Sequence, residues 1–219
     1  MGRRSRIALA AARWLGTKEG TKEHLELLTV YNSIKPLPRG YHMTDKDPWC
    51  AAFVSAAAVL AGEGEAYPME CSCSRIIEKA REMKIWVEDD RYVPLLADWV
   101  LYDWQSEAEG DCAGAPDHVG IVIGRDAGVL LVAEGNYDNM VKLRKIPVNY
   151  GKIRGYVCPK LEEETAMRYH TLEEVPGYAR ATIEKLTKDG SLKGISGDDL
   201  GLTEELIRIL VILDRRGVI

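Results

Sequence analysis

The sequence predicts an α+β fold in which helices come first along the chain and a meander of strands follows. An apolar, alanine-rich run over residues 48–61 is typical of a buried helix. From residue 100 onward, short segments rich in β-branched residues are separated by Gly, Asp and Asn, which favours antiparallel pairing. Together these observations predict helices packed on one antiparallel sheet.

Three helical segments are expected before the strands. Residues 1–34 predict one or two helices, of which the first is amphipathic. Its apolar face contains Ile7, Ala8, Ala11, Trp14 and Leu15. The next helix should have Asp47 as its N-cap and Pro48 at its first position, and should end at Gly62. Residues 74–84 predict a third helix.

Five strands are expected in the second part of the chain. They cover residues 100–104, 118–124, 129–136, 141–146 and 153–159. The second and third of these should form a hairpin around a turn near Arg125–Gly128.

The chain is expected to divide into a catalytic domain over residues 1–160, an acidic linker over 161–165 and a small helical module over 166–219. In this module, Thr171 with Glu174 has the pattern of a capping box. The helix opened by Pro176 should stop near Gly190, and a second helix should run from Thr203 to Gly217. Such a module has a small core, so it is either marginally stable alone or packed on its neighbour.

Composition excludes several classes of protein. The 219 residues carry 29 basic and 34 acidic side chains, so the net charge of −5 gives no basic excess for binding nucleic acid. No run approaches 18 apolar residues, so membrane insertion is not expected. The basic and apolar start lacks a cleavage site, which argues against a Sec signal and for synthesis in the cytoplasm.

The five cysteines are an odd number at irregular spacings, which favours a reducing compartment over a disulfide framework. Zinc binding by Cys71, Cys73 and Cys112 is disfavoured, because the CxxC pairs and the histidines at ligand spacing are missing. Cys50 differs from the others, since it falls in the first turn of a predicted helix. The positive end of the helix dipole favours a thiolate there.

If Cys50 is a nucleophile, it needs a partner base, and the hairpin is predicted to contain one. In an antiparallel pair centred on the expected turn, His118 and Glu134 should lie opposite or diagonal to each other on one face of the sheet. Asn136 should share that face by strand alternation, together with Gly120 and Gly124. A carboxylate beside an imidazole fixes its tautomer and stabilises its charged form. The other histidines, at 24, 42 and 170, are expected on the surface or in loops.

Three motifs, DPWCAAFVS around Cys50, DHVGIV around His118 and VAEGN over residues 132–136, resemble the CHAP family of papain-like cell-wall hydrolases. The resemblance covers residues 5–160. The segments ECSCSRIIE (70–78) and WVEDDRYVPLLADWVLYDW (86–104) are similar to CHAP-type endolysins of phages and prophages of Gram-positive hosts. Where many members have Pro-Gly-Asp before the first strand, this chain has Leu-Ala-Asp (96–98), a change expected to alter only a turn.

The resemblance implies a papain-like CHAP fold and a bacteriolytic enzyme that hydrolyses an amide bond of peptidoglycan. Cys50 would be the nucleophile and His118 the general base and then acid. Glu134 would orient the imidazole, and Asn136 would support the same network. The family requires neither a metal nor an organic cofactor. The enzyme would reach the cell wall after a phage-type release.

Some functional questions stay open at the level of sequence. The bond cleaved could be that of an N-acetylmuramoyl-L-alanine amidase or of an endopeptidase of the peptide stem or cross-bridge. A non-catalytic wall-binding protein, or a cysteine protease or deamidase with a protein target, are the alternatives. The tail resembles a small helical module attached to phage and clostridial-type lysins. Its roles left open are wall targeting, self-association to a homo-oligomer, and stabilisation of the enzyme.

Overall fold

The computed structural model describes residues 2–89, 91–105, 114–126, 128–161, 168–195 and 199–219, so residues 162–165 of the predicted acidic linker lie outside it. The helices are α1 (Arg3–Ala12), α2 (Lys22–Asn32), α3 (Cys50–Leu60), α4 (Cys73–Glu82), α5 (Gly177–Lys188) and α6 (Glu204–Arg215), with short 3-10 turns η1 (Pro38–Gly40) and η2 (Gly64–Ala66). The strands are β1 (Trp86–Val87), β2 (Trp99–Tyr102), β3 (His118–Asp126), β4 (Val129–Glu134), β5 (Lys142–Pro147), β6 (Ile153–Val157), β7 (Arg168–Tyr169) and β8 (Leu202–Thr203).

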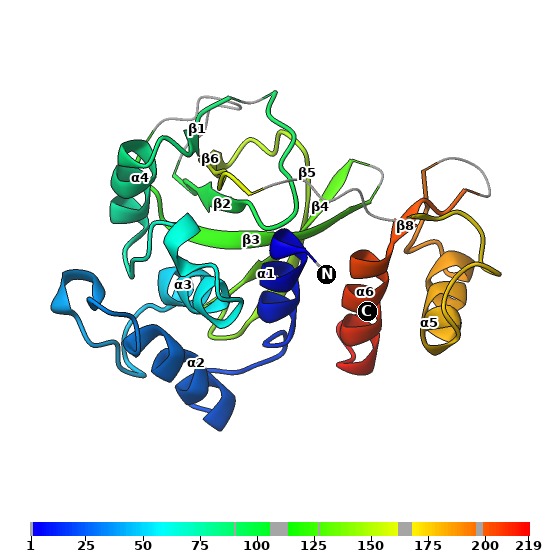
Figure 1. The fold of residues 1–219 in the computed structure, drawn as a ribbon, viewed down its shortest axis with the longest axis horizontal. Helices are drawn as coiled ribbons and strands as arrows, with labels where there is room; N and C mark the ends of the chain where they lie inside the picture. The colour runs from blue at the N-terminus through cyan, green and yellow to red at the C-terminus, as the bar shows by residue number, and fades with distance from the viewer. Residues whose placement is uncertain (1, 90, 106–113, 127, 162–167, 196–198) are drawn as a thin grey trace.

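Six strands form one antiparallel sheet in the order β1-β6-β2-β3-β4-β5 (Figure 1). The five predicted strands are all present, with ends that differ by a few residues, whereas β1 was not predicted. The predicted α+β class, with N-terminal helices on an antiparallel sheet, is therefore confirmed.

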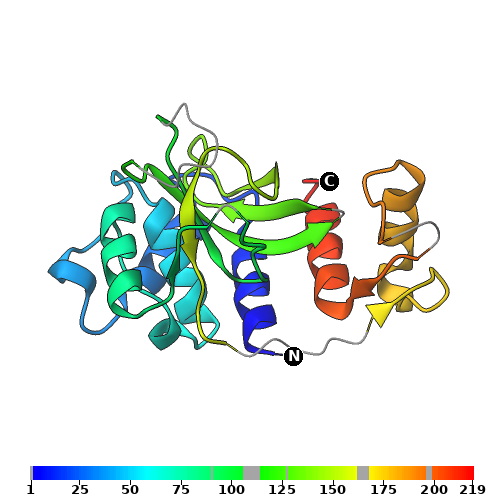
Figure 2. The same ribbon diagram turned by 90° about the horizontal axis from the view of Figure 1, so that it is seen from above.

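One face of the sheet carries the main hydrophobic core. Helices α1, α3 and α6 all contact β3, and their apolar side chains form a single cluster with those of β3 and β4. Seen from above, α1 and α6 lie side by side along the sheet (Figure 2). The opposite face has a smaller apolar cluster that includes Tyr102, Val122 and Val132. Strand alternation thus divides the side chains between two cores of unequal size.

Helix α3 is apolar all round because it is enclosed by α1, α2 and the sheet. It ends as predicted, just before Gly62, which adopts a φ of 75°. Its start differs from the prediction, since the N-cap is Trp49 and no side chain caps the helix. Asp47 instead accepts hydrogen bonds from the Thr44 amide and hydroxyl and from the Tyr41 hydroxyl, which closes the preceding loop.

Two other predictions for the helical half need correction. The first helix ends at Ala12, so Trp14 and Leu15 are buried as expected but lie beyond the helix. His24 is completely buried in α2, where its ring lies 4.6 Å from that of Trp49 and its Nδ1 accepts a hydrogen bond from the Gly20 amide. The expectation that His24 lies on the surface or in a loop is therefore wrong.

The Leu-Ala-Asp sequence (96–98) forms the turn before β2, with an alanine in a left-handed backbone conformation. Ala97 is buried and adopts a φ of 70°, in the region that favours glycine. Its amide donates to the Val122 carbonyl, and its own carbonyl accepts from the Tyr67 hydroxyl. The next residue, Asp98, is paired with Arg4 of α1 at 2.8 Å. Contacts to the sheet and to α1 therefore hold the alanine in this conformation.

The C-terminal module contains both predicted helices. The Thr203 hydroxyl accepts from the Leu206 amide and caps α6, as expected. The predicted capping box closes a turn instead, since Glu174 accepts from the Thr171 amide but α5 begins only after Pro176. The module is also not all-α, because β7 and β8 pair beside the helices.

The module packs on the remainder of the chain. Leucines of α5 and α6 belong to the same hydrophobic cluster as α1 and the sheet. The Arg216 guanidinium donates to the Leu15 carbonyl at 2.7 Å, which ties the end of α6 to the end of α1. The structure therefore has the module packed on its neighbour, and the module's small core does not stand alone.

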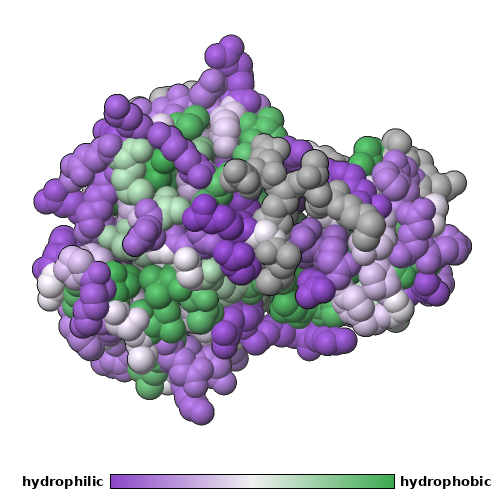
Figure 3. Space-filling view, viewed as in Figure 1, coloured by the Kyte–Doolittle hydropathy of each residue, from purple (hydrophilic) through white to green (hydrophobic). Residues whose placement is uncertain are grey.

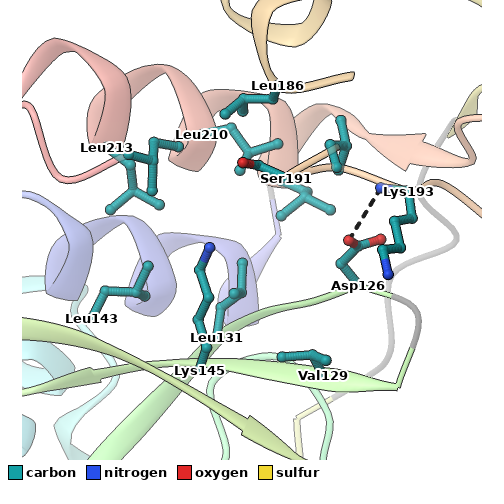
Figure 4. Close-up of a pocket in the computed structure, with 13 residues that line it drawn as sticks. Asp126, Val129, Leu131, Leu143, Lys145, Leu186, Ser191, Lys193, Leu210 and Leu213 are labelled. Carbon is teal, nitrogen blue, oxygen red and sulfur yellow. Dashed lines mark hydrogen bonds between the residues drawn. The ribbon is translucent and has the colours of Figure 1, made fainter. Parts of the chain in front are cut away.

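A cavity of about 180 Å³ lies where the module meets the sheet (Figure 4). Its walls are mostly leucine side chains from β4, β5, α5 and α6, and the exposed Lys145 and Lys193 contribute polar edges. The lining residues are Asp126, Val129, Leu131, Leu143, Lys145, Leu186, Ser191, Leu192, Lys193, Leu206, Leu210, Leu213 and Ile219. None of these is a cysteine or histidine, so the cavity is distinct from the predicted catalytic residues.

The visible surface differs between the two parts of the molecule. Hydrophobic residues gather on the left, around α3, whereas hydrophilic residues cover most of the module on the right (Figure 3). Within the described residues, no helix has both the length and the apolar character that crossing a membrane would require.

Candidate active site

Cys50 is the first residue of α3, where backbone N–H groups have no partner within the helix and the helix dipole is positive. Its side chain belongs to the main hydrophobic core, lies against Cys73 of α4 and is only 8% exposed. The amide of Ala51 donates a hydrogen bond that favours the ionised sulfur. The helix start thus provides a sheltered and electropositive place for a thiolate.

His118 begins β3 and Glu134 ends β4, and their Nε2 and Oε2 atoms are 3.1 Å apart. The register pairs Ile121 with Ala133, which places His118 diagonal to Glu134, as the sequence predicted. Gly120 makes this approach possible, since a Cβ there would lie 2.7 Å from Cγ of Glu134. A side chain at this position would displace the carboxylate.

The second glycine of β3 does not share this face. The register between β3 and β4 shifts between Val122 and Gly124, so Gly124 pairs with Leu131. Gly124 consequently faces the helices, where a Cβ would lie 3.0 Å from a methyl group of Leu206. The expectation that Gly124 lies beside His118 is wrong because alternation breaks at this bulge.

Asn136 is not brought into the network by strand alternation. Strand β4 ends at Glu134, and Asn136 adopts a φ of 56° in the turn that follows. Among the described residues, its side chain forms no hydrogen bond with His118 or Glu134. The predicted strand extends to Asn136, whereas β4 ends two residues earlier.

The histidine and the cysteine influence each other's protonation. Burial favours neutral His118, but hydrogen bonds with Cys50 and Glu134 outweigh it and raise the pKa of His118 to about 9. The pKa of Cys50 is lowered by a hydrogen bond from Cys73, with further lowering by His118, against the effect of burial. The favoured state is a thiolate beside an imidazolium.

Arg144 on β5 completes the environment of Glu134 and was missed by the sequence analysis. Its Nε donates to Oε1 of Glu134 at 2.7 Å. Burial would raise the pKa of this fully buried carboxyl, but the hydrogen bonds with His118 and Arg144 outweigh burial and lower the pKa. Each carboxylate oxygen therefore has its own cationic partner.

Aromatic rings surround this ion pair. The Arg144 guanidinium lies 4.1 Å from the ring centroid of Tyr137 and 4.9 Å from that of Trp104. Trp104 is 36% exposed, and its ring centroid is 6.2 Å from that of His118. The indole therefore provides a solvent-facing surface beside the histidine that a substrate can contact.

The cysteines fall into different environments. Cys73, the first residue of α4, has its sulfur 3.9 Å from that of Cys50. Cys71 instead accepts a hydrogen bond from Arg39 at 3.0 Å. Cys158 lies next to the other, smaller core and is half-buried. Cys112, the third member of the disfavoured zinc set, lies outside the described residues. The closeness of Cys73 to Cys50 had no signal in the sequence, because 23 residues separate them.

Comparison of the chain with models of known protein families, with curated proteins and with solved structures found no match.

Proposed function

We propose that this protein is a cysteine-dependent peptidoglycan hydrolase of the CHAP type, acting on an amide bond of the bacterial cell wall. The observation that carries the proposal is the 3.1 Å contact between His118 and Glu134, beside a thiol at the start of α3, Cys50, whose pKa His118 helps to lower. Nucleophile, base and orienting carboxylate are the three parts that acyl transfer by a thiol needs. The choice of peptidoglycan as substrate depends on the CHAP resemblance.

In the proposed mechanism, the thiolate of Cys50 attacks the carbonyl carbon of the scissile amide. The oxyanion that forms is stabilised by the unpaired backbone N–H groups at the start of α3, that of Cys50 among them. His118 then gives its proton to the leaving amine and next removes a proton from the water that hydrolyses the thioester. Glu134, held by Arg144, keeps the imidazole oriented throughout.

Purified peptidoglycan from a Gram-positive bacterium is the substrate for the direct test. We expect the wild-type protein to reduce its turbidity and to release soluble fragments, and Cys50→Ala to do neither while keeping its circular dichroism spectrum. Mass spectrometry of the fragments distinguishes a free L-alanine amine, the product of an amidase, from a cut within the stem or cross-bridge. Full activity of Cys50→Ala would overturn the proposal.

Two further outcomes would point to the alternatives. Sedimentation of the wild-type protein with peptidoglycan, without any released fragment, would support a wall-binding protein. Cleavage or deamidation of casein, with purified wall left intact, would support an enzyme with a protein substrate. Both experiments use the same preparations and the same Cys50→Ala control.

A further inference from the structure

Cys50 and Cys73 form a pair of thiols at the starts of two neighbouring helices. Their sulfur atoms are 3.9 Å apart, close to van der Waals contact, and both cysteines are free. Cys50 is the first residue of α3 and Cys73 the first residue of α4. They are 8% and 9% exposed, so each side chain keeps a small area that a hydroperoxide can contact.

The two thiols differ in their protonation. The hydrogen bond between them lowers the pKa of Cys50 and raises that of Cys73, and burial adds to the increase at Cys73. His118 interacts with Cys50 and further favours its ionised form. Cys50 is thus the sulfur that reacts first with an electrophile, and Cys73 is a protonated thiol in contact with it.

We propose that Cys50 and Cys73 are a site of reversible covalent modification, at which a hydroperoxide converts the two thiols into a disulfide. The thiolate of Cys50 attacks the terminal oxygen of the peroxide, the O–O bond breaks, and the sulfenic acid of Cys50 forms, while the hydroxide or alkoxide that leaves takes the proton of the His118 imidazolium. The sulfur of Cys73 then attacks that of Cys50, the S–O bond breaks, and hydroxide leaves with the Cys73 proton as water. The sulfur pair is oxidised by two electrons, and the peroxide is reduced to water or to an alcohol and water.

The disulfide would have two consequences for the site. It removes the thiolate that the proposed function requires, so the enzyme is inactive until a dithiol reduces the bond. It also stops oxidation at a reversible stage, because a sulfenic acid without a neighbouring thiol proceeds to the irreversible sulfinic acid. The statement about activity rests on the proposed function, whereas formation of the bond does not.

The neighbouring cysteines offer matched controls. Cys71 is two residues from Cys73 but is bonded to Arg39, and Cys158 lies next to the smaller core. Cys71→Ser therefore changes the nearest alternative partner while leaving the sulfur pair in place. Cys73→Ser removes the resolving thiol and keeps a hydroxyl at the start of α4.

The bond is tested with the reduced full-length protein exposed to increasing hydrogen peroxide, denatured in iodoacetamide and digested. Trypsin is unsuitable, because residues 47–75 form one tryptic peptide that contains Cys50, Cys71 and Cys73. Cleavage after glutamate separates residues 27–63 from residues 71–78, and a disulfide joins these two peptides. We expect the joined species in the wild-type protein and in Cys71→Ser, and its loss in Cys73→Ser.

Two results would overturn the proposal. One is oxidation of Cys50 to the sulfinic acid in the wild-type protein with no joined peptide. The other is an equal yield of joined peptide in Cys73→Ser, which would assign the bond to Cys71. Circular dichroism of Cys73→Ser and Cys73→Ala identifies a variant that fails to fold, and Cys71→Ser still tests the pair in that case.

Activity on purified peptidoglycan gives a separate readout. After peroxide treatment and then dithiothreitol, we expect at least about fivefold more activity to return in the wild-type protein than in Cys73→Ser. Equal recovery would contradict the protective role of Cys73. If the protein has no hydrolase activity at all, the proposed function fails, while the peptide experiment still decides whether the disulfide forms.

Discussion

Two histidine–carboxylate pairs of similar length lie in different parts of the molecule. At the end of the sheet, Nε2 of His118 is 3.1 Å from Oε2 of Glu134, and in the module Nδ1 of His170 is 2.8 Å from Oδ1 of Asp199. The side chains of the first pair are 12% and 0% exposed, and those of the second are 52% and 39% exposed.

The difference between the pairs lies in their surroundings. Glu134 has Arg144 on its second oxygen, and His118 has the Cys50 thiol as a further partner. The module pair is more than a third exposed on both sides, so water screens the interaction. A short distance between a histidine and a carboxylate therefore does not by itself indicate catalysis, and the proposal for His118 and Glu134 depends also on their burial and on the nearby thiol.

The largest expected effect comes from removing His118, with the removal of His170 as the matched control. His118→Ala should reduce peptidoglycan hydrolysis by at least about 10³-fold, because the base and the proton donor are lost together. His170→Ala should leave the rate within about twofold, since screened surface pairs contribute little. Rates of turbidity loss with matched protein concentrations measure both, and comparable losses in the two variants would contradict the assignment.

Next in size is the effect of neutralising the carboxylates. Glu134→Gln keeps the shape of the side chain but removes the charge that stabilises the imidazolium, so we expect a loss of about 10²-fold. The same change lowers the pKa of His118, so the alkaline limit of activity should move to lower pH. Asp199→Asn is the matched control in the module, and an unchanged pH profile in Glu134→Gln would show that Glu134 has no such role.

The pH dependence of the wild-type protein follows from the raised pKa of His118. The imidazolium must carry a proton to give to the leaving group, and it loses this proton as the pH rises through about 9. Hydrolysis should therefore fall about tenfold per pH unit above that value. Rates measured from pH 6 to 10.5, with each sample returned to neutral pH to confirm that it is still folded, test this. A rate that continues to rise above pH 10 would contradict it.

The smallest effects concern the free energy of unfolding and compare one arginine–glutamate pair in each region, Arg144–Glu134 and Arg208–Glu204. Arg144→Gln leaves the buried Glu134 with one partner, so we expect a loss of about 1–3 kcal/mol in the free energy of unfolding. Arg208 bonds Glu204 through Nε at 2.9 Å but is 51% exposed. Arg208→Gln should therefore cost no more than about 0.5 kcal/mol. Urea denaturation measures both changes, and equal values would remove the distinction between the two regions.

The sequence allowed a good prediction of the local elements, because their signals are local. The apolar run predicted α3 and its end, and the position of the expected turn predicted that His118 lies next to Glu134. The prediction failed where alternation stops, at the bulge before Gly124 and in the turn that contains Asn136. One extra residue in a strand, relative to its partner, moves every later side chain of that strand to the opposite face. The residue types around the bulge in β3 do not indicate its position.

The residues missed at the site belong to elements brought together by tertiary structure. Arg144 pairs with Val132 in the register between β4 and β5, and Val132 lies on the same face of β4 as Glu134. The sequence alone does not give this register, so it could not place Arg144 beside Glu134. Nothing local to the sequence around Cys73 indicates that α4 begins against the start of α3. Hydrophobic periodicity places each helix on a core and leaves the contacts between helix ends undetermined.

The bond between Arg216 and Leu15 joins residues that are 201 positions apart. During synthesis, α1 leaves the ribosome long before α6 exists, and the chain emerges at only about 5–20 residues per second. The apolar flank of α1 that α6 covers must therefore wait about ten seconds or more for its partner. Until α6 has formed, this flank of α1 is an exposed apolar surface on the nascent chain, which can aggregate or bind a chaperone.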